Sequence, residues 1–181
     1  YSHGMFESVY DYPYLSSSAN HIFDLTVGYS SDSVFSGSGT QNSKKINIYN
    51  QMASVLMGHD VSGNIQKFDE DGNILAGGAK LESCIFVNFA RLLTKDEIKK
   101  GSFNLQLGAS ASFDSGSTGR TEMQSLITIA DTNAANNFKV NSPTGEYGIL
   151  YGSGSVMPAS TPVGLLFYQA GVAVLTSSVW D

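Results

Sequence analysis

The sequence GLLFYQAGVAVLT at residues 164–176 is the clearest indication of a fold class in this chain. Its two apolar runs, at residues 164–169 and 172–175, are too short for buried helices, and Ala170-Gly171 separates them. Glycine adopts the positive φ that a tight turn between strands requires. Short apolar runs beside turn residues are typical of buried β-strands. We therefore expect an antiparallel hairpin here.

Alternating patterns predict more strands upstream. Between residues 20 and 29, Phe23, Leu25 and Val27 alternate with polar or small residues, as in a strand with one buried face. The other predicted strands lie at residues 83–89, 102–108, 124–130, 137–141 and 146–152. Loops are predicted where Ser and Gly cluster, at residues 30–40 and 109–120.

One segment has a helical pattern instead. In residues 44–57, apolar side chains recur at helical spacing from Ile46 to Leu56. This pattern predicts an amphipathic helix of about 14 residues that covers a face of the sheet. Ser43 is the expected N-cap, and Gly58 is expected just past the end.

A second, short helix is predicted at residues 94–100. Thr94 and Glu97 have the spacing of a capping box, in which each side chain bonds an amide of the first helical turn. Gly101 follows, at the position where glycine commonly ends a helix.

These elements predict a mainly β fold: an antiparallel β-sandwich or open barrel with one amphipathic helix and one short helix. We expect a single β-rich domain over residues 1–181, with residues 1–19 as an extended arm. Because the chain starts at Tyr1 without Met and stops just after an apolar stretch, we expect a fragment of a longer protein. The expected core contains Phe23, Leu25, Phe86, Phe103, Leu105, Ile129 and Phe167.

Composition excludes several classes of protein. Only 14% of residues are charged, so the polar surface comes largely from Ser, Asn, Thr and 19 Gly, which suits a turn-rich β protein. The net charge of −6 argues against a nucleic-acid clamp or a binder of anionic membranes. No apolar run reaches the roughly 18 residues of a membrane span. The single Cys84 cannot form an internal disulfide, and its apolar neighbours indicate a buried thiol.

The sequence lacks the common catalytic motifs. His3, His21 and His59 do not have zinc-ligand spacing. No Gly-x-Ser-x-Gly motif occurs, so a Ser-His-Asp site is unsupported, although the many serines do not exclude one. We therefore expect no enzyme, no cofactor and no catalytic metal.

Residues 67–74 are predicted to form a hairpin with an Asp71-Gly72 turn. The acidic residues of this segment also suggest calcium. If Gly72 is the sixth residue of an EF-hand loop, the first and last residues are Lys67 and Gly78, where acidic residues are required. An EF-hand is therefore excluded, and a looser calcium site stays open.

Four stretches of the chain are familiar together: YSHGMFESVYDYPY at residues 1–14, KKINIYNQM at 44–52, ARLLTKDEIKKGSF at 90–103 and FYQAGVAVLT at 167–176. This combination resembles virion structural proteins of large marine contractile-tailed bacteriophages, especially cyanophages. The last stretch also resembles hairpins of phage tail and baseplate proteins. The resemblance implies a virion protein that binds other virion subunits or copies of itself as a homo-oligomer. It implies no catalytic residues, and we expect no nucleic-acid, membrane or small-molecule partner.

The predicted interface residues are Tyr10, Tyr12, Tyr14 and Trp180, because large and fairly rigid aromatic side chains are enriched at interfaces. The arm that carries the three tyrosines could equally pack on its own domain. The alternative function is a β-sandwich that binds a carbohydrate or a receptor, since Tyr, Trp, Asn, Gln and Asp side chains also suit sugars. A hydrolase fragment is the third option.

Overall fold

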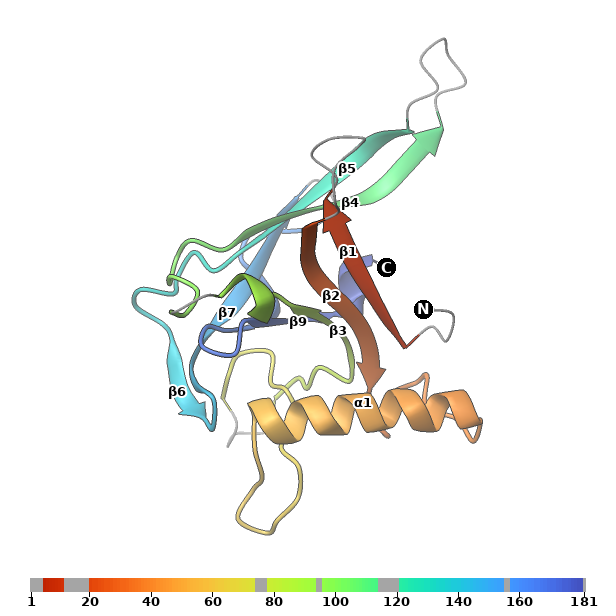
Figure 1. The fold of residues 1–181 in the computed structure, drawn as a ribbon, viewed down its shortest axis with the longest axis vertical. Coiled ribbons are helices and arrows are strands. Elements are labelled where there is room, and N and C mark those ends of the chain that lie inside the picture. Colours follow the sequence, from red (N-terminus) through yellow and green to blue (C-terminus); the bar gives the residue numbers. More distant parts are fainter. Residues whose placement is uncertain are drawn as a thin grey trace.

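The computed structural model describes residues 5–11, 20–73, 78–93, 96–113, 121–154 and 157–180, without the side chains of Arg91, residues 109–125 and Trp180 (Figure 1). Strands take up 44% and helices 16% of these residues, so the fold is mainly β, as predicted. The strands are β1 (Phe6–Asp11), β2 (Asn20–Tyr29), β3 (Ser83–Asn88), β4 (Asn104–Phe113), β5 (Thr121–Ala130), β6 (Lys139–Ser142), β7 (Gly145–Gly154), β8 (Thr161–Phe167) and β9 (Val172–Thr176). The helical segments are α1 (Thr40–Leu56) and two 3-10 turns, η1 (Ala90–Leu92) and η2 (Ser177–Trp180).

All the described strands belong to one sheet with antiparallel pairing throughout. Its order is β1-β2-β3-β9-β8-β7-β5-β4, and β6 pairs with β7 beside this path. The sheet curls into a half-barrel (Figure 1). The predicted antiparallel, mainly β fold is therefore confirmed in its open-barrel form. β1 and β4 are the two edge strands of this path.

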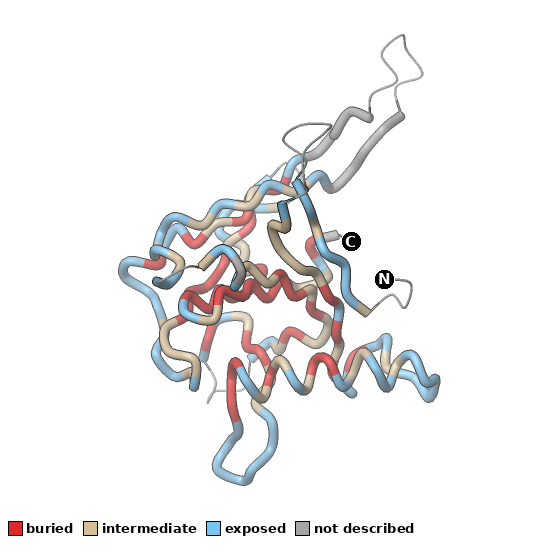
Figure 2. The backbone as a smooth tube through the Cα atoms, viewed as in Figure 1, coloured by how far each residue is buried: buried red, intermediate tan, exposed pale blue. Residues whose placement is uncertain are grey.

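The hairpin predicted at residues 164–176 lies at the centre of the sheet, and Gly171 in its turn has a φ of 66°. Phe167 and Val174 belong to an apolar cluster on the convex face, which α1 covers. Leu166 and Ala173 belong to a second cluster on the concave face. Figure 2 shows burial concentrated in these central strands. Because both faces are covered, the sequence is continuously apolar here instead of alternating.

The predicted amphipathic helix is present, but it begins earlier than residue 44. Gly39 is the N-cap in extended conformation, and the Ser43 amide already donates a helical hydrogen bond of 3.2 Å to the Gly39 carbonyl. The expected end is confirmed, since Gly58 follows α1 with a φ of 80°. The earlier start adds a polar first turn, which the apolar periodicity could not indicate.

The contact between α1 and β2 depends on Gly28. A Cβ atom at Gly28 would lie 2.8 Å from the Tyr49 nitrogen and 3.1 Å from the Lys45 carbonyl oxygen. The missing side chain therefore lets the helix backbone approach the strand closely. Tyr49 itself is buried and donates a hydrogen bond of 2.8 Å to the Leu81 carbonyl.

The short helix predicted at residues 94–100 is wrong for its described part. Residues 96–100 are irregular, and the nearest helical turn is η1. The Ile98 amide donates a hydrogen bond of 3.1 Å to the Tyr168 carbonyl, and the Ile98 side chain packs on the concave cluster. This tertiary contact replaces the local hydrogen bonds that the capping box supports. Residues 94–95 lie outside the described residues.

The loop predicted at residues 109–120 is wrong at its start. β4 continues to Phe113, which pairs with Thr121 at the beginning of β5. The Ala and Ser residues of this part of β4 lack an apolar alternation, so cross-strand pairing extends the strand where side-chain pattern does not. Residues 114–120 lie outside the described residues.

The hairpin predicted at residues 67–74 is confirmed only at its turn. Gly72 has a φ of 70°, as a glycine turn requires. In the described part of this segment, the pairing is an isolated bridge between Asp69 and Lys80 rather than a ladder. Residues 74–77 are not described.

Three of the seven predicted core residues, Phe86, Ile129 and Phe167, are buried as expected. The other four are only half-buried, against the concave cluster: Phe23, Leu25, Phe103 and Leu105. Three of these four residues, Phe23 and Leu25 on β2 and Leu105 on β4, lie on the open side of the half-barrel, where their apolar faces line a pocket.

Candidate assembly groove

The open side of the half-barrel contains an apolar groove with a volume of about 1120 Å³. β2, β3 and β4 supply most of its apolar wall: Phe23, Leu25, Val27, Ile85, Leu105 and Leu107. Alternation along each strand directs these side chains to one face. The groove therefore lies between parts of the sheet that are far apart in strand order.

Part of this wall is open to solvent. Val27 is 40% exposed, and Phe6 of β1 at the margin of the groove is 51% exposed. Contiguous exposed apolar surface around a concavity marks interaction sites more often than isolated exposed side chains do. The groove is therefore the strongest candidate functional surface among the described residues.

The structure does not bring the predicted interface residues together within its described part. Tyr10 lies on β1, is 48% exposed and lines the groove. Tyr12 and Tyr14 lie outside the described residues. The backbone of Trp180 ends η2, and its side chain is not described. Residues 6–11 of the expected arm form β1, which pairs with β2. The proposed interface role of the four aromatic residues stays a prediction.

A polar cluster ties β1 to β2 beside the groove. The Ser8 hydroxyl donates a hydrogen bond of 2.6 Å to Asp24 Oδ1, and His21 Nε2 lies 2.7 Å from the same oxygen. The Tyr10 ring meets the His21 ring edge-on, with centroids 5.3 Å apart. A serine nucleophile needs the histidine between its hydroxyl and the carboxylate. Here the carboxylate lies between serine and histidine, so this geometry holds two strands together and does not activate Ser8.

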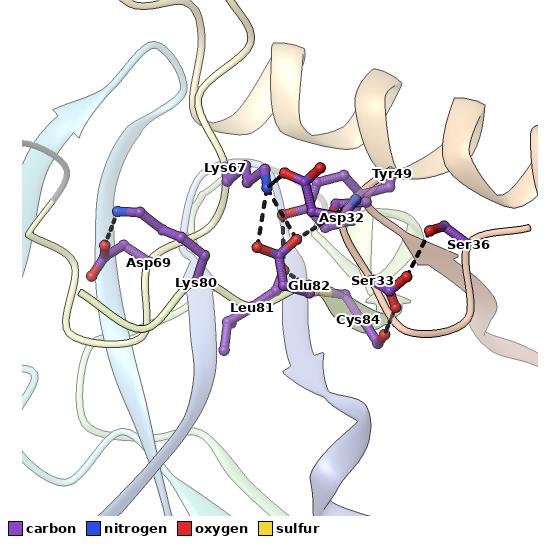
Figure 3. Close-up of polar contacts among 12 residues, drawn as sticks. Asp32, Ser33, Ser36, Tyr49, Lys67, Asp69, Lys80, Leu81, Glu82 and Cys84 are labelled. Atoms are coloured by element: carbon purple, nitrogen blue, oxygen red, sulfur yellow. Dashed lines mark hydrogen bonds and ion pairs between the residues drawn. The ribbon is translucent and has the colours of Figure 1, made fainter. Parts of the chain in front are cut away.

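A second polar network lies between α1 and the segment before β3 (Figure 3). The Lys67 ammonium is 2.5 Å from an Asp32 carboxylate oxygen and 3.0 Å from a Glu82 oxygen. Burial opposes the charge on Lys67, but the hydrogen bonds to Asp32 and Glu82 raise its pKa above the ordinary value. Ser30 also donates a hydrogen bond to Glu82. These contacts hold the loop after β2 against Lys67 and against Glu82, which directly precedes β3.

A buried carboxylate positions the start of β4, which forms one wall of the groove. Asp131 is 1% exposed and accepts hydrogen bonds from the amides of Gly101 at 2.7 Å and Phe103 at 3.0 Å. The Tyr168 hydroxyl donates to the same carboxylate at 3.2 Å. Burial, followed by the nearby Asp131 charge, raises the pKa of Tyr168 above its ordinary value. The edge strand is thus anchored at one end by tertiary hydrogen bonds.

The described residues contain no cluster of three or more His, Cys, Asp or Glu side chains that could hold a metal ion. In the predicted hairpin, the Asp69 carboxylate forms an ion pair with Lys80. No helix in the described part of the chain has both the length and the apolar character to cross a membrane.

No protein-family model, no curated protein and no solved structure matches this chain. The groove and the sheet edges are therefore the features of this chain that can support a functional proposal.

Sequence patterns identified part of the groove but assigned it to the core. Leu25 and Leu105 were expected to be buried because alternation shows which side chains share a face. Alternation cannot show whether another element covers that face. Leu107 carries the same alternation, whereas Ile85 lies in a continuously apolar run. In both cases, the sequence pattern does not reveal the open side of the half-barrel.

Proposed function

We propose that this chain is a structural subunit that acts by assembling with other protein chains, in a virion of the contractile-tailed bacteriophage type that its sequence resembles. The apolar groove beside the open side of the half-barrel carries the assembly part of this proposal. The sequence resemblance carries the virion part.

Physical chemistry favours burial of this surface in an assembly. Each square ångström of apolar surface removed from water contributes roughly 25 cal/mol. Charged groups are expensive to desolvate, and only 14% of the residues are charged. A partner that covers the groove would therefore gain apolar burial at a small desolvation cost.

The alternative, a carbohydrate- or receptor-binding module, has weaker support from the groove. Its central wall is mainly aliphatic, with Leu25, Val27, Ile85, Leu105 and Leu107. Specific small-molecule sites combine apolar walls with a few converging polar groups. Sugar binding is therefore the alternative outcome that a glycan array would detect.

The test has two arms. Light scattering of the purified chain over a wide concentration range should show association that Leu107→Ser weakens. The matched control Val61→Ser changes a fully exposed side chain that does not line the groove and should have no effect. Mass spectrometry of purified phage particles whose genome encodes this chain should detect the chain in stoichiometric amounts. A chain that is monomeric, absent from particles and positive on a glycan array would contradict the proposal.

A further inference from the structure

The two edge strands of the sheet differ in charge. β1 carries Glu7 and Asp11, both exposed, and its pairing with β2 is irregular between Val9 and Tyr10. β4 has no Asp, Glu, Lys or Arg in its ten residues. Charges, bulges and short length are the devices by which proteins prevent edge strands from pairing with other chains. The pairing of β4 with β5 is also irregular, between Gly108 and Ala111, so the two edges differ in charge: β1 carries two carboxylates and β4 carries no charge along its whole length.

β4 also extends beyond the support of the sheet. β4 and β5 pair from Asn104↔Ala130 to Phe113↔Thr121, whereas β5 pairs with β7 only over Ile127–Ala130. Among the described strands, the outer half of this ribbon has only two strands, and Figure 1 shows it extending away from the rest of the molecule. An isolated two-stranded ribbon is marginally stable in water, and additional strands stabilise it.

We propose that the β4 strands of two copies pair antiparallel across a two-fold axis and join two half-barrels into one continuous sheet. This inference rests on the proposed assembly function and names its partner, a second copy of this chain. The pairing adds main-chain hydrogen bonds along the edge. It also joins the two-stranded β4–β5 ribbons of both copies into one four-stranded ribbon.

Charge favours β4 over β1 as the shared edge, and a second copy over a foreign chain. Each copy has a net charge of −6, so two copies approach most easily where neither presents a charge. Pairing of β1 with itself would bring Glu7 and Asp11 of both copies into one small interface. A foreign partner selected by charge would be basic and would suit β1, whereas an uncharged strand is complementary to itself.

The test measures distances between spin labels in the purified chain. Asn104→Cys and Gln106→Cys place labels at exposed positions on β4, and the native Cys84 is buried, so labelling is selective. In an antiparallel self-pairing, the separation of two equivalent residues changes by about 7 Å for each residue of distance from the axis, twice the strand rise. The two sites should therefore give separations that differ by about 14 Å, the larger one at whichever site lies farther from the axis, or two equally short ones if the axis lies midway between them. Gln41→Cys, exposed on α1, is the matched control for labelling, and its separation is not tied to the β4 register.

Light scattering of the unlabelled chain accompanies these measurements and should show a dimer. A chain that associates but gives two long separations that do not differ by about 14 Å would overturn the β4 pairing and leave assembly through another surface intact. A monomeric chain with no dipolar signal would also overturn it, and the particle measurement would then decide the proposed function separately. Circular dichroism of each variant confirms that the labelled chains are folded.

Discussion

The Tyr168 hydroxyl donates a hydrogen bond of 3.2 Å to the Asp131 carboxylate, although 37 positions separate the two residues in the sequence. Both residues are buried, and the same carboxylate also accepts the amides of Gly101 and Phe103. One side chain thus connects the β8–β9 corner to the start of the edge strand β4.

Replacing this carboxylate should destabilise the fold. In Asp131→Asn, one acceptor oxygen becomes an NH₂ group, so a backbone amide loses its partner in a buried site. We expect the free energy of unfolding to fall by about 1–3 kcal/mol, measured by urea denaturation. The control Asp96→Asn alters an exposed carboxylate and should change stability by less than about 0.5 kcal/mol. Equal losses in the two variants would contradict the structural role of Asp131.

Leucines of the groove and of the core should differ in their cost of truncation. Leu165 is fully buried on the convex side, and Leu165→Ala should cost about 2–5 kcal/mol. Leu105 is half-buried, so Leu105→Ala removes less buried surface and should cost about 1–2 kcal/mol. Thermal unfolding of both variants at a concentration where the chain is monomeric measures the difference. If both cost the same, the groove is covered in the isolated chain.

The Asp69–Lys80 ion pair should make stability depend on pH in the acid range. Burial raises the pKa of Asp69, but hydrogen bonds from Asp71 and Lys80 outweigh it and hold the pKa below 3.8. Because the pKa is lower in the folded than in the unfolded chain, the ionised carboxylate stabilises the fold above about pH 4, and this contribution is lost as the pH falls through the folded pKa. The stability difference between wild type and Asp69→Asn should therefore shrink as the pH falls below 3.8. Urea denaturation at a series of pH values tests this, and a difference independent of pH would refute it.

Cys84 should react with thiol reagents only when the chain unfolds. Its side chain is fully buried on the convex side, and burial, with a smaller effect of Glu82, raises the pKa of the thiol. The thiolate is the reactive form, so a raised pKa and lack of access both slow the reaction. Colorimetric thiol titration should detect no fast-reacting thiol in the native chain and one in denaturant. A fast reaction under native conditions would mean that β3 opens readily.

Local sequence patterns predicted those strands and helices in which the burial of successive side chains follows a regular period. β2 has the predicted bounds, residues 20–29, because its alternation of apolar with polar or small residues extends over much of the strand. The central hairpin was predictable because both of its faces are buried. The groove was predictable only as apolar faces of strands, since Leu25 and Leu105 have the same alternation as residues that are fully covered.

Sequence patterns alone specify a mainly β chain with one long helix, because side-chain periodicity is a local property of strands and helices. Tertiary structure decides the rest. The Ile98–Tyr168 hydrogen bond replaces a predicted helix, and Asp131 sets where β4 begins. Which strands form the sheet edges, and where the half-barrel stays open, depends on contacts between residues far apart in sequence. Local propensities amount to fractions of a kilocalorie per residue, so such long-range contacts outweigh them wherever the two disagree.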